Sequence, residues 1–264
     1  MHIEIIDFYY FSGTGNTLLV IKAMEEVFVG SGVVVNYYPI ESSKPEDIDL
    51  EHTIGLAFPV ALQGTFSFIW DFINDMPTTQ ETSVFMMDTL MAFSGGIVGP
   101  VRNILKRKGY KTIGAKEIIM PSNYSSKKIS EEKKNRIITK ASALAEEFAK
   151  DIVSGESNWG YIPMISNLMS IISRSSKIWN LMSNIFSLKV TESKCTKCEL
   201  CVKLCPINAI IMDEYPVIGD SCRLCMRCIS FCPTNAINPK KIKIIPYKSI
   251  SLKNIYKQRV NNKI

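Results

Sequence analysis

The sequence predicts an α/β protein with a doubly wound parallel sheet of five strands, followed by a small cysteine-rich α+β domain. Two observations support this fold class. In residues 1–155, apolar strand-like runs alternate with amphipathic segments, which is the pattern of a parallel sheet covered by helices on both faces. All eight cysteines fall later, in residues 195–232. The 264 residues are enough for two such units.

Five segments of the first unit have the composition of buried strands. The first, residues 3–11, is a run of Ile, Phe and Tyr that only Glu4 and Asp7 interrupt. Such runs are typical of strands that are covered on both faces. The other expected strands are residues 33–38, 53–60, 83–88 and 113–120. Helical spacing of apolar residues predicts helices between them, at residues 18–29, 66–75, 97–108 and 131–153.

A loop of small residues joins the first strand to the first helix. Backbone N–H groups at the start of a helix can bind an anion, and the helix dipole favours negative charge there. The loop lacks the lysine of a nucleoside-triphosphate loop, and Leu18 stands where a dinucleotide loop has its third glycine. We therefore predict a site for a terminal monophosphate such as that of FMN, against the alternative of an ordinary glycine-containing turn. The loop consists of Ser12, Gly13, Thr14, Gly15, Asn16 and Thr17.

Two identical C-x2-C-x2-C-x3-C-P runs contain the eight cysteines, and a displacement of 27 residues carries the first run onto the second. The same displacement carries Asn208, Ala209 and Ile210 onto 235–237, so the region is an internal repeat. This is the bacterial ferredoxin spacing, in which the fourth cysteine of each run serves the other cluster. The pattern assigns Cys195, Cys198, Cys201 and Cys232 to one 4Fe-4S cluster, and Cys222, Cys225, Cys228 and Cys205 to a second.

Zinc and disulfides are the alternatives for these cysteines. Structural zinc usually shows two CxxC pairs, often with histidine, but the histidines here are His2 and His52, far upstream. Disulfides would crowd the C-x2-C-x2-C spacing and need an oxidising compartment. The sequence begins without the basic region and cleavage site of a signal peptide. It also lacks a run of about 20 apolar residues, so we expect a cytoplasmic protein with no transmembrane segment.

A segment rich in apolar residues, 156–190, separates the two units. Its apolar residues recur every three or four positions, whereas flexible linkers are rich in Gly, Ser or charge. We predict that it packs as one or two helices between the units and sets the distance between them. The cysteine-rich domain is expected at residues 191–240.

A basic tail is predicted at residues 241–264. Positions 239–264 contain eight Lys or Arg and no acidic residue, and subtracting these eight from 31 leaves 23 basic against 25 acidic residues in the rest of the chain. This balance argues against nucleic-acid binding. The tail is expected to be solvated or to fold over the acidic body, with docking to an acidic partner or membrane surface as the alternative.

The loop FSGTGNT directly after the first strand resembles the phosphate loop of flavodoxins. Together with the cysteine repeat, it makes the chain similar to the flavodoxin-ferredoxin fusion proteins of anaerobes. The resemblance implies a flavodoxin-like sheet in the order 2-1-3-4-5 and a ferredoxin domain with two 4Fe-4S clusters. It also implies that the loops after the third and fourth strands hold the flavin ring, although they lack the Trp and Tyr that often flank it. The ring-binding role is carried onto Pro59, Val60, Ala61, Leu62, Phe93, Gly95 and Gly96.

The functional hypothesis that follows is an electron-transfer protein with FMN and two 4Fe-4S clusters, acting between redox protein partners. It requires no catalytic acid or base. One alternative is a flavin-dependent reductase of a small-molecule acceptor, with its cleft beneath the polar loop at residues 121–129; that loop is otherwise an ordinary surface loop. The other alternative is a redox-sensing interaction module that uses the basic tail. The sequence does not determine the oligomeric state.

Overall fold

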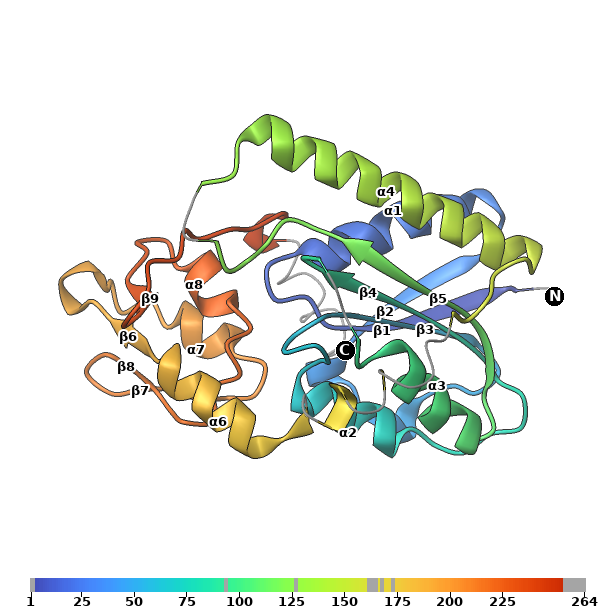
Figure 1. Ribbon diagram of the computed structural model, residues 1–264, viewed down its shortest axis with the longest axis horizontal. Helices are drawn as coiled ribbons and strands as arrows, with labels where there is room; N and C mark the ends of the chain where they lie inside the picture. The colour runs from blue at the N-terminus through green and yellow to red at the C-terminus, as the bar shows by residue number, and fades with distance from the viewer. Residues whose placement is uncertain are drawn as a thin grey trace.

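The computed structural model describes residues 3–92, 95–125, 128–160, 166, 169–171 and 174–253. Its larger unit is a parallel sheet in the order β2-β1-β3-β4-β5 (Figure 1). This is the predicted fold class and the flavodoxin strand order, so both predictions are confirmed. The strands are β1 (Ile5–Tyr10), β2 (Val34–Pro39), β3 (Thr53–Pro59), β4 (Ser83–Leu90) and β5 (Lys111–Ile119).

Helices cover both faces of the sheet, as Figure 1 shows. The helices α1 (Asn16–Gly30) and α4 (Glu131–Ser154) lie on one face, and α2 (Ser67–Asp75) and α3 (Val98–Arg107) lie on the other. Successive side chains of a strand point to opposite faces. In β1, Phe8 therefore packs beneath α1 and α4 whereas Tyr9 packs on the α2 side.

The ends of α4 illustrate how the local sequence sets the bounds of an element. The backbone N–H of Lys133 donates to Oγ of Ser130 at 3.3 Å, which caps the first turn. At the other end Gly155 has a φ of 79°, the left-handed conformation in which many helices terminate. The helix therefore agrees with its predicted range to within one residue at its C-terminal end.

The two units include residues from both ends of the segment that was predicted as a linker. The backbone N–H of Ala115 on β5 donates to the carbonyl of Asn158 at 3.1 Å. The indole N–H of Trp159 donates to the carbonyl of Val98 at 2.9 Å. At the other end of the segment, β6 (Leu188–Val190) pairs with β9 (Ile237–Pro239). Residues at both ends of this segment therefore form hydrogen bonds with the two units, whereas a flexible linker would not.

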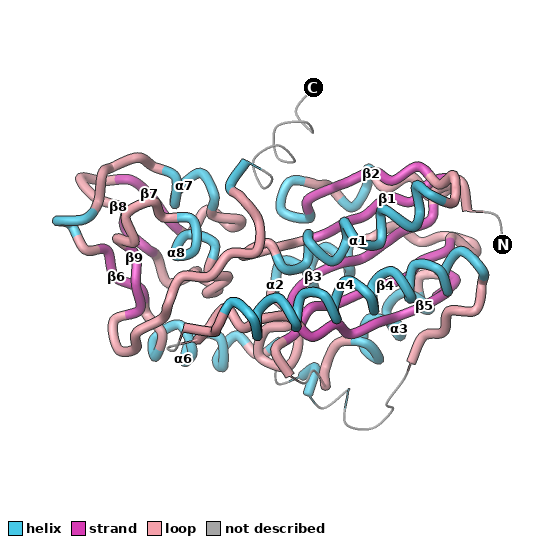
Figure 2. The backbone as a smooth tube through the Cα atoms, turned by 90° about the horizontal axis from the view of Figure 1, so that it is seen from above, coloured by secondary structure: helices cyan, strands magenta, loops and turns pink. Residues whose placement is uncertain are grey.

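The small unit lies at the end of the sheet where the parallel strands terminate (Figures 1 and 2). Its two antiparallel ladders are β6–β9 and β7–β8. Helix α6 (Ser176–Ile185) precedes it along the chain. None of the helices in the described part of the chain is long and apolar enough to cross a membrane. The remaining elements are α7 (Leu200–Leu204), β7 (Ile210–Met212), β8 (Pro216–Ile218) and α8 (Arg227–Phe231).

Candidate functional site

The predicted phosphate loop, residues 12–17 and called the phosphate loop below, joins β1 to α1 and has features expected of an anion site. Gly15 has a φ of 103°, a left-handed conformation that favours glycine, and α1 begins at the next residue. The side chains of Ser12, Thr14, Asn16 and Thr17 are buried. The first turn of α1 contains no acidic residue, so nothing on that turn opposes the positive end of the helix dipole.

Side-chain hydrogen bonds hold the phosphate loop against neighbouring elements. Oγ1 of Thr14 donates to Oδ1 of Asn123 at 2.8 Å, in the loop that follows β5. The hydroxyls of Thr17 and Thr89 lie 2.9 Å apart and connect α1 to the end of β4. Contacts within the protein therefore hold the loop from two sides.

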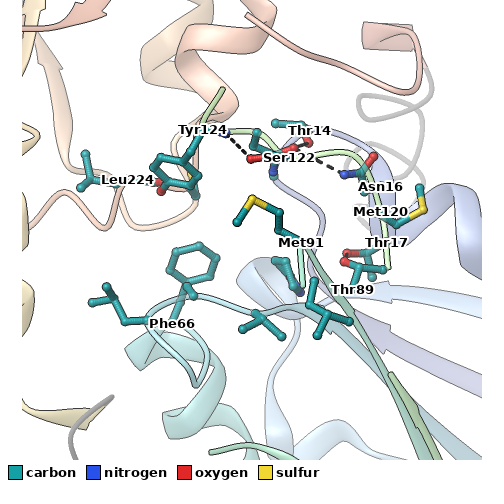
Figure 3. A pocket seen from close by; sticks show the side chains of 18 of the residues that line it. Thr14, Asn16, Thr17, Phe66, Thr89, Met91, Met120, Ser122, Tyr124 and Leu224 are labelled. Carbon is teal, nitrogen blue, oxygen red and sulfur yellow. Dashed lines mark hydrogen bonds between the residues drawn. The ribbon is translucent and has the colours of Figure 1, made fainter. Parts of the chain in front are cut away.

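A cavity of about 430 Å³, which we call the central cavity, lies beside the phosphate loop (Figure 3). In Figure 3, Thr14 and Asn16 lie on one side of it, and Phe66 and Tyr124 lie on the other. The structure therefore brings the predicted phosphate loop and the loop after β3 together around one space. The predicted cofactor-binding residues that line it are Ser12, Gly13, Thr14, Asn16, Thr17, Pro59, Val60, Ala61 and Leu62.

The other predicted ring-binding residues are placed differently. Gly95 and Gly96 are described but are not part of the cavity wall, and Phe93 lies outside the described residues. Strand β4 continues to Leu90, two residues beyond its expected end, so Thr89, Leu90 and Met91 form this part of the wall. Gly96 packs on the neighbouring loop instead, where its N–H donates to the carbonyl of Gln63 at 2.9 Å.

The loop after β3 is a tight two-residue turn. Ala61 and Gly64 exchange two backbone hydrogen bonds of 2.8 and 3.0 Å. The two residues between them, Leu62 and Gln63, have φ values of 52° and 63°. Left-handed conformations are uncommon outside glycine and tend to occur where the surroundings enforce them. Here the turn includes Leu62 in the wall of the central cavity.

Aromatic side chains from outside the predicted flavin loops complete the central cavity. Phe66 and Trp179 have ring centroids 5.8 Å apart, and Tyr124 and Phe186 have centroids 6.4 Å apart with nearly perpendicular planes. All four residues line the cavity. Trp179 and Phe186 were not among the predicted site residues, because they belong to the apolar segment 156–190 that was expected to separate the two units. Their spacing with Met182, at three and four residues, was the available signal.

The eight cysteines line two further cavities in the small unit, in the predicted crossed sets. Cys195, Cys198, Cys201 and Cys232 line the first. Cys205, Cys222, Cys225 and Cys228 line the second. The fourth cysteine of each run therefore lies beside the three thiols of the other run. We refer to these spaces as the first and second cluster cavities.

The backbone around the cysteines repeats with the same displacement as the sequence. Lys197 and Glu199 have left-handed φ values of 55° and 58°, and their counterparts Leu224 and Met226 have 54° and 64°. Consecutive turns of this kind point backbone N–H groups into a common concavity that favours anions. The N–H of Ala209 donates to Sγ of Cys205 at 3.1 Å, and its counterpart Ala236 donates to Sγ of Cys232 at 3.2 Å.

Burial favours the protonated form of two of these thiols, so binding of a metal would have to displace their protons. Burial raises the pKa of Cys225 to about 12 and that of Cys201 to about 11, whereas coordination to a metal deprotonates a thiol outright. A cubane distributes its four thiolates over four irons, an arrangement that differs from the tetrahedral site of one zinc ion.

The second cluster cavity adjoins the central cavity. Cys225 and Leu224 line both spaces. The hydroxyl of Tyr124 donates to the carbonyl of Leu224, which ties the loop after β5 to the cysteine run. The residues of the first cluster cavity do not line the central cavity. The two cluster cavities are therefore not equivalent: the second one is next to the phosphate loop.

The segment predicted as a basic tail returns to the phosphate loop. The hydroxyl of Tyr247 donates to Oδ1 of Asn16 at 2.9 Å, and the backbone N–H of Ser249 donates to the carbonyl of Thr14 at 3.0 Å. A Cβ on Gly15 would lie 2.4 Å from Cγ1 of Ile250, so this glycine faces the segment rather than the cavity. Residues 254–264 of the predicted tail lie outside the described residues.

Comparisons with known proteins agree with the cysteine pattern. Residues 188–211 and 215–238 match the family model of a 4Fe-4S binding domain. Similar solved structures include a Megasphaera elsdenii flavodoxin (21% identity, TM-score 0.40, 53% of this chain and 98% of that chain). A flavodoxin from the domain Archaea (13%, 0.40, 56% and 98%) and one from Streptococcus pneumoniae TIGR4 (15%, 0.39, 54% and 99%) are also similar. A search of curated proteins gave no match. The chain therefore joins a parallel sheet in the order β2-β1-β3-β4-β5 to a small unit whose two repeats match the family model of a 4Fe-4S binding domain.

Proposed function

We propose that this chain is an electron-transfer protein that connects two 4Fe-4S clusters to a bound FMN, and so links one-electron to two-electron redox partners. The observation that carries the proposal is the position of Cys225, which lines both the second cluster cavity and the central cavity. When bound, the clusters would supply single-electron transfer and the flavin would supply transfer of one or two electrons.

The phosphate end of the flavin site is assigned to the phosphate loop. The loop lies at the start of α1, where backbone N–H groups and the helix dipole favour an anion. Asn16 is oriented from two directions: its Nδ2 donates to the carbonyl of Pro121 at 2.9 Å, and its Oδ1 accepts from Tyr247. The loop is therefore fixed in place, which reduces the entropy lost when a ligand binds.

The ring end is assigned to the apolar part of the central cavity. Its volume of about 430 Å³ falls within the roughly 300–1,000 Å³ that is usual for small-molecule and cofactor sites. Phe66 and Trp179 are only 4% exposed, so this wall of the cavity is a buried apolar surface that a flavin ring could contact.

Protein partners are expected to approach the first cluster cavity. Its Cys198 is exposed, whereas Cys228 of the second cluster cavity is buried. Electron transfer between proteins requires a short distance between redox centres, so the exposed side of the small unit is the better point of exchange. Electrons would then pass between the protein partner and the flavin by way of the first cluster and then the second cluster, in either direction.

Anaerobic purification with quantitation of iron, sulfide and flavin tests the proposal. About eight irons per chain are expected for two 4Fe-4S clusters, together with stoichiometric FMN. Zinc in place of iron, or a folded chain that does not bind FMN, would overturn it. Rapid turnover of small-molecule acceptors, with slow reduction of protein acceptors, would favour the flavin-dependent reductase instead.

A further inference from the structure

The two cysteine repeats differ at one position in a way that their spacing does not predict. The displacement of 27 residues that superimposes every cysteine carries Leu200 onto Arg227. These residues begin the equivalent helices α7 and α8. One repeat thus has an aliphatic side chain where the other has a permanent cation.

Arg227 is buried against the larger unit. Its side chain is 3% exposed, and its Nη1 donates to Oε1 of Glu41 at 2.6 Å. Glu41, whose side chain is 2% exposed, lies in the short 3-10 helix Ile40–Ser42 after β2. A second donor, Nη2, reaches the carbonyl of Ser12 in the phosphate loop at 3.0 Å. The guanidinium carbon lies 4.7 Å from the centre of the Phe11 ring.

The same side chain belongs to the second cluster cavity. Arg227 lies between Cys225 and Cys228 in sequence and lines the cavity with them. Its Nε–H is buried and has no hydrogen-bond partner among the described residues. Buried donors are nearly always paired, and a cluster contributes sulfur atoms that accept hydrogen bonds. One donor of this buried cation is therefore without a partner among the described residues, in a side chain that belongs to a residue lining the second cluster cavity.

The first cluster cavity has a different electrostatic environment. Leu200 lines it in place of the arginine. The nearby cations Lys197 and Lys203 are 46% and 57% exposed and pair with Glu214 and Glu199. Exposed charges are screened by water and salt, whereas a buried charge is screened much less. Net charge and hydrogen bonds to sulfur both influence the potential of a cluster, and the buried charge beside the cavity differs between the repeats.

We propose that Arg227 raises the reduction potential of the second cluster above that of the first, so that the cluster beside the central cavity has the higher affinity for an electron. This inference rests on the proposed function, because it assumes that both clusters are present. Glu41 offsets part of the positive charge and holds the guanidinium against the phosphate loop. Arg227 does not itself accept or donate the electron; its effect is on the reduction potential of the cluster.

The test is a potentiometric titration of the full-length, cluster-loaded chain, followed by electron paramagnetic resonance. In the wild type we expect two distinct potentials. The double variant Arg227→Met with Glu41→Met removes the ion pair without leaving either charge buried alone. We expect one cluster to lose at least tenfold in affinity for its electron, which is about 59 mV for a one-electron couple, while the other cluster is unchanged. Glu41→Gln should shift the same cluster in the opposite direction.

Lys203→Met is the matched control, since it removes an exposed cation that is two residues from both Cys201 and Cys205. We expect little change in either potential. If iron analysis shows two clusters and the double variant keeps both wild-type potentials, or if Lys203→Met produces the same shift, the role of Arg227 is wrong and the proposed function stands. If iron analysis shows no clusters, both proposals fail.

Discussion

The Cβ atom that Gly13 lacks would lie 2.3 Å from the carbonyl oxygen of Cys225. Gly13 belongs to the phosphate loop, and Cys225 belongs to the second cluster cavity. The backbones of the two units therefore touch at a point where only glycine fits. Docking of the units explains this glycine without reference to a bound phosphate.

Gly13→Ala is expected to destabilise the chain by about 1–3 kcal/mol, the usual cost of overpacking, because the carbonyl of Cys225 must move. Anaerobic denaturant unfolding measures the effect. Gly30→Ala is the control: a Cβ there would have nothing within 4 Å, and replacing a helical glycine by alanine stabilises by up to about 1 kcal/mol. If Gly13→Ala is as stable as the wild type, the two loops do not touch in solution.

Tyr247→Phe is expected to weaken FMN binding about 2- to 10-fold, the equivalent of one net hydrogen bond of about 0.5–1.5 kcal/mol. Burial raises the pKa of Tyr247 to about 12, so its hydroxyl keeps its proton at neutral pH and donates to Asn16. Fluorescence titration of the flavin-free chain with FMN gives the dissociation constant. Tyr215→Phe, beside Lys197 in the other unit, should have no effect. Unchanged binding in Tyr247→Phe would contradict a role for the C-terminal segment in this site.

Cys205→Ser and Cys232→Ser distinguish the two clusters despite the crossed arrangement. We expect each variant to lose about four irons, but Cys205→Ser should remove the cluster nearer the flavin although Cys205 belongs to the first run. Flash reduction of the flavin, followed by cluster absorbance, should then show slower electron exchange with the flavin in Cys205→Ser than in Cys232→Ser. The reverse order would mean that the second cluster cavity is not the one next to the flavin.

Asp88 on β4 makes the stability depend on pH. Its side chain is fully buried, and neither carboxylate oxygen has a hydrogen-bond partner among the described residues. Burial, and secondarily the charge of Glu117, raises its pKa well above the ordinary value of 3.8. As pH rises above that value, the unfolded chain releases this proton while the folded chain keeps it, so the free energy of unfolding falls.

Asp88→Asn is expected to abolish the fall in the free energy of unfolding with rising pH. The Tm of this variant should therefore exceed that of the wild type by more at about pH 8 than at about pH 5. Thermal unfolding across that range is the measurement. Asp213→Asn, at an exposed position in the β7–β8 hairpin, should leave the pH dependence unchanged. A wild-type pH dependence in Asp88→Asn would show that Asp88 is already ionised in the folded state.

Several features could be predicted because their signal is local in sequence. The apolar runs that became β1 and β3, and the loop of small residues before α1, depend on residues a few positions apart. The crossed cysteine sets followed from a repeat in which Cys205 and Cys232 occupy equivalent places. The end of β4 was less predictable, since pairing with β5 extends it to Leu90 beyond the point where its own composition suggests a loop.

Local sequence patterns were enough to predict the two units, the loop at residues 12–17 and the crossed cysteine sets, because short-range periodicity and spacing specify all three. How the units face each other depends on long-range packing. The Arg227–Glu41 pair joins residues 186 positions apart, and the Tyr247–Asn16 bond joins residues 231 positions apart. Such contacts depend on how complete surfaces pack, and no local pattern encodes them. The same packing brings Trp179 from the expected spacer into the wall of the central cavity.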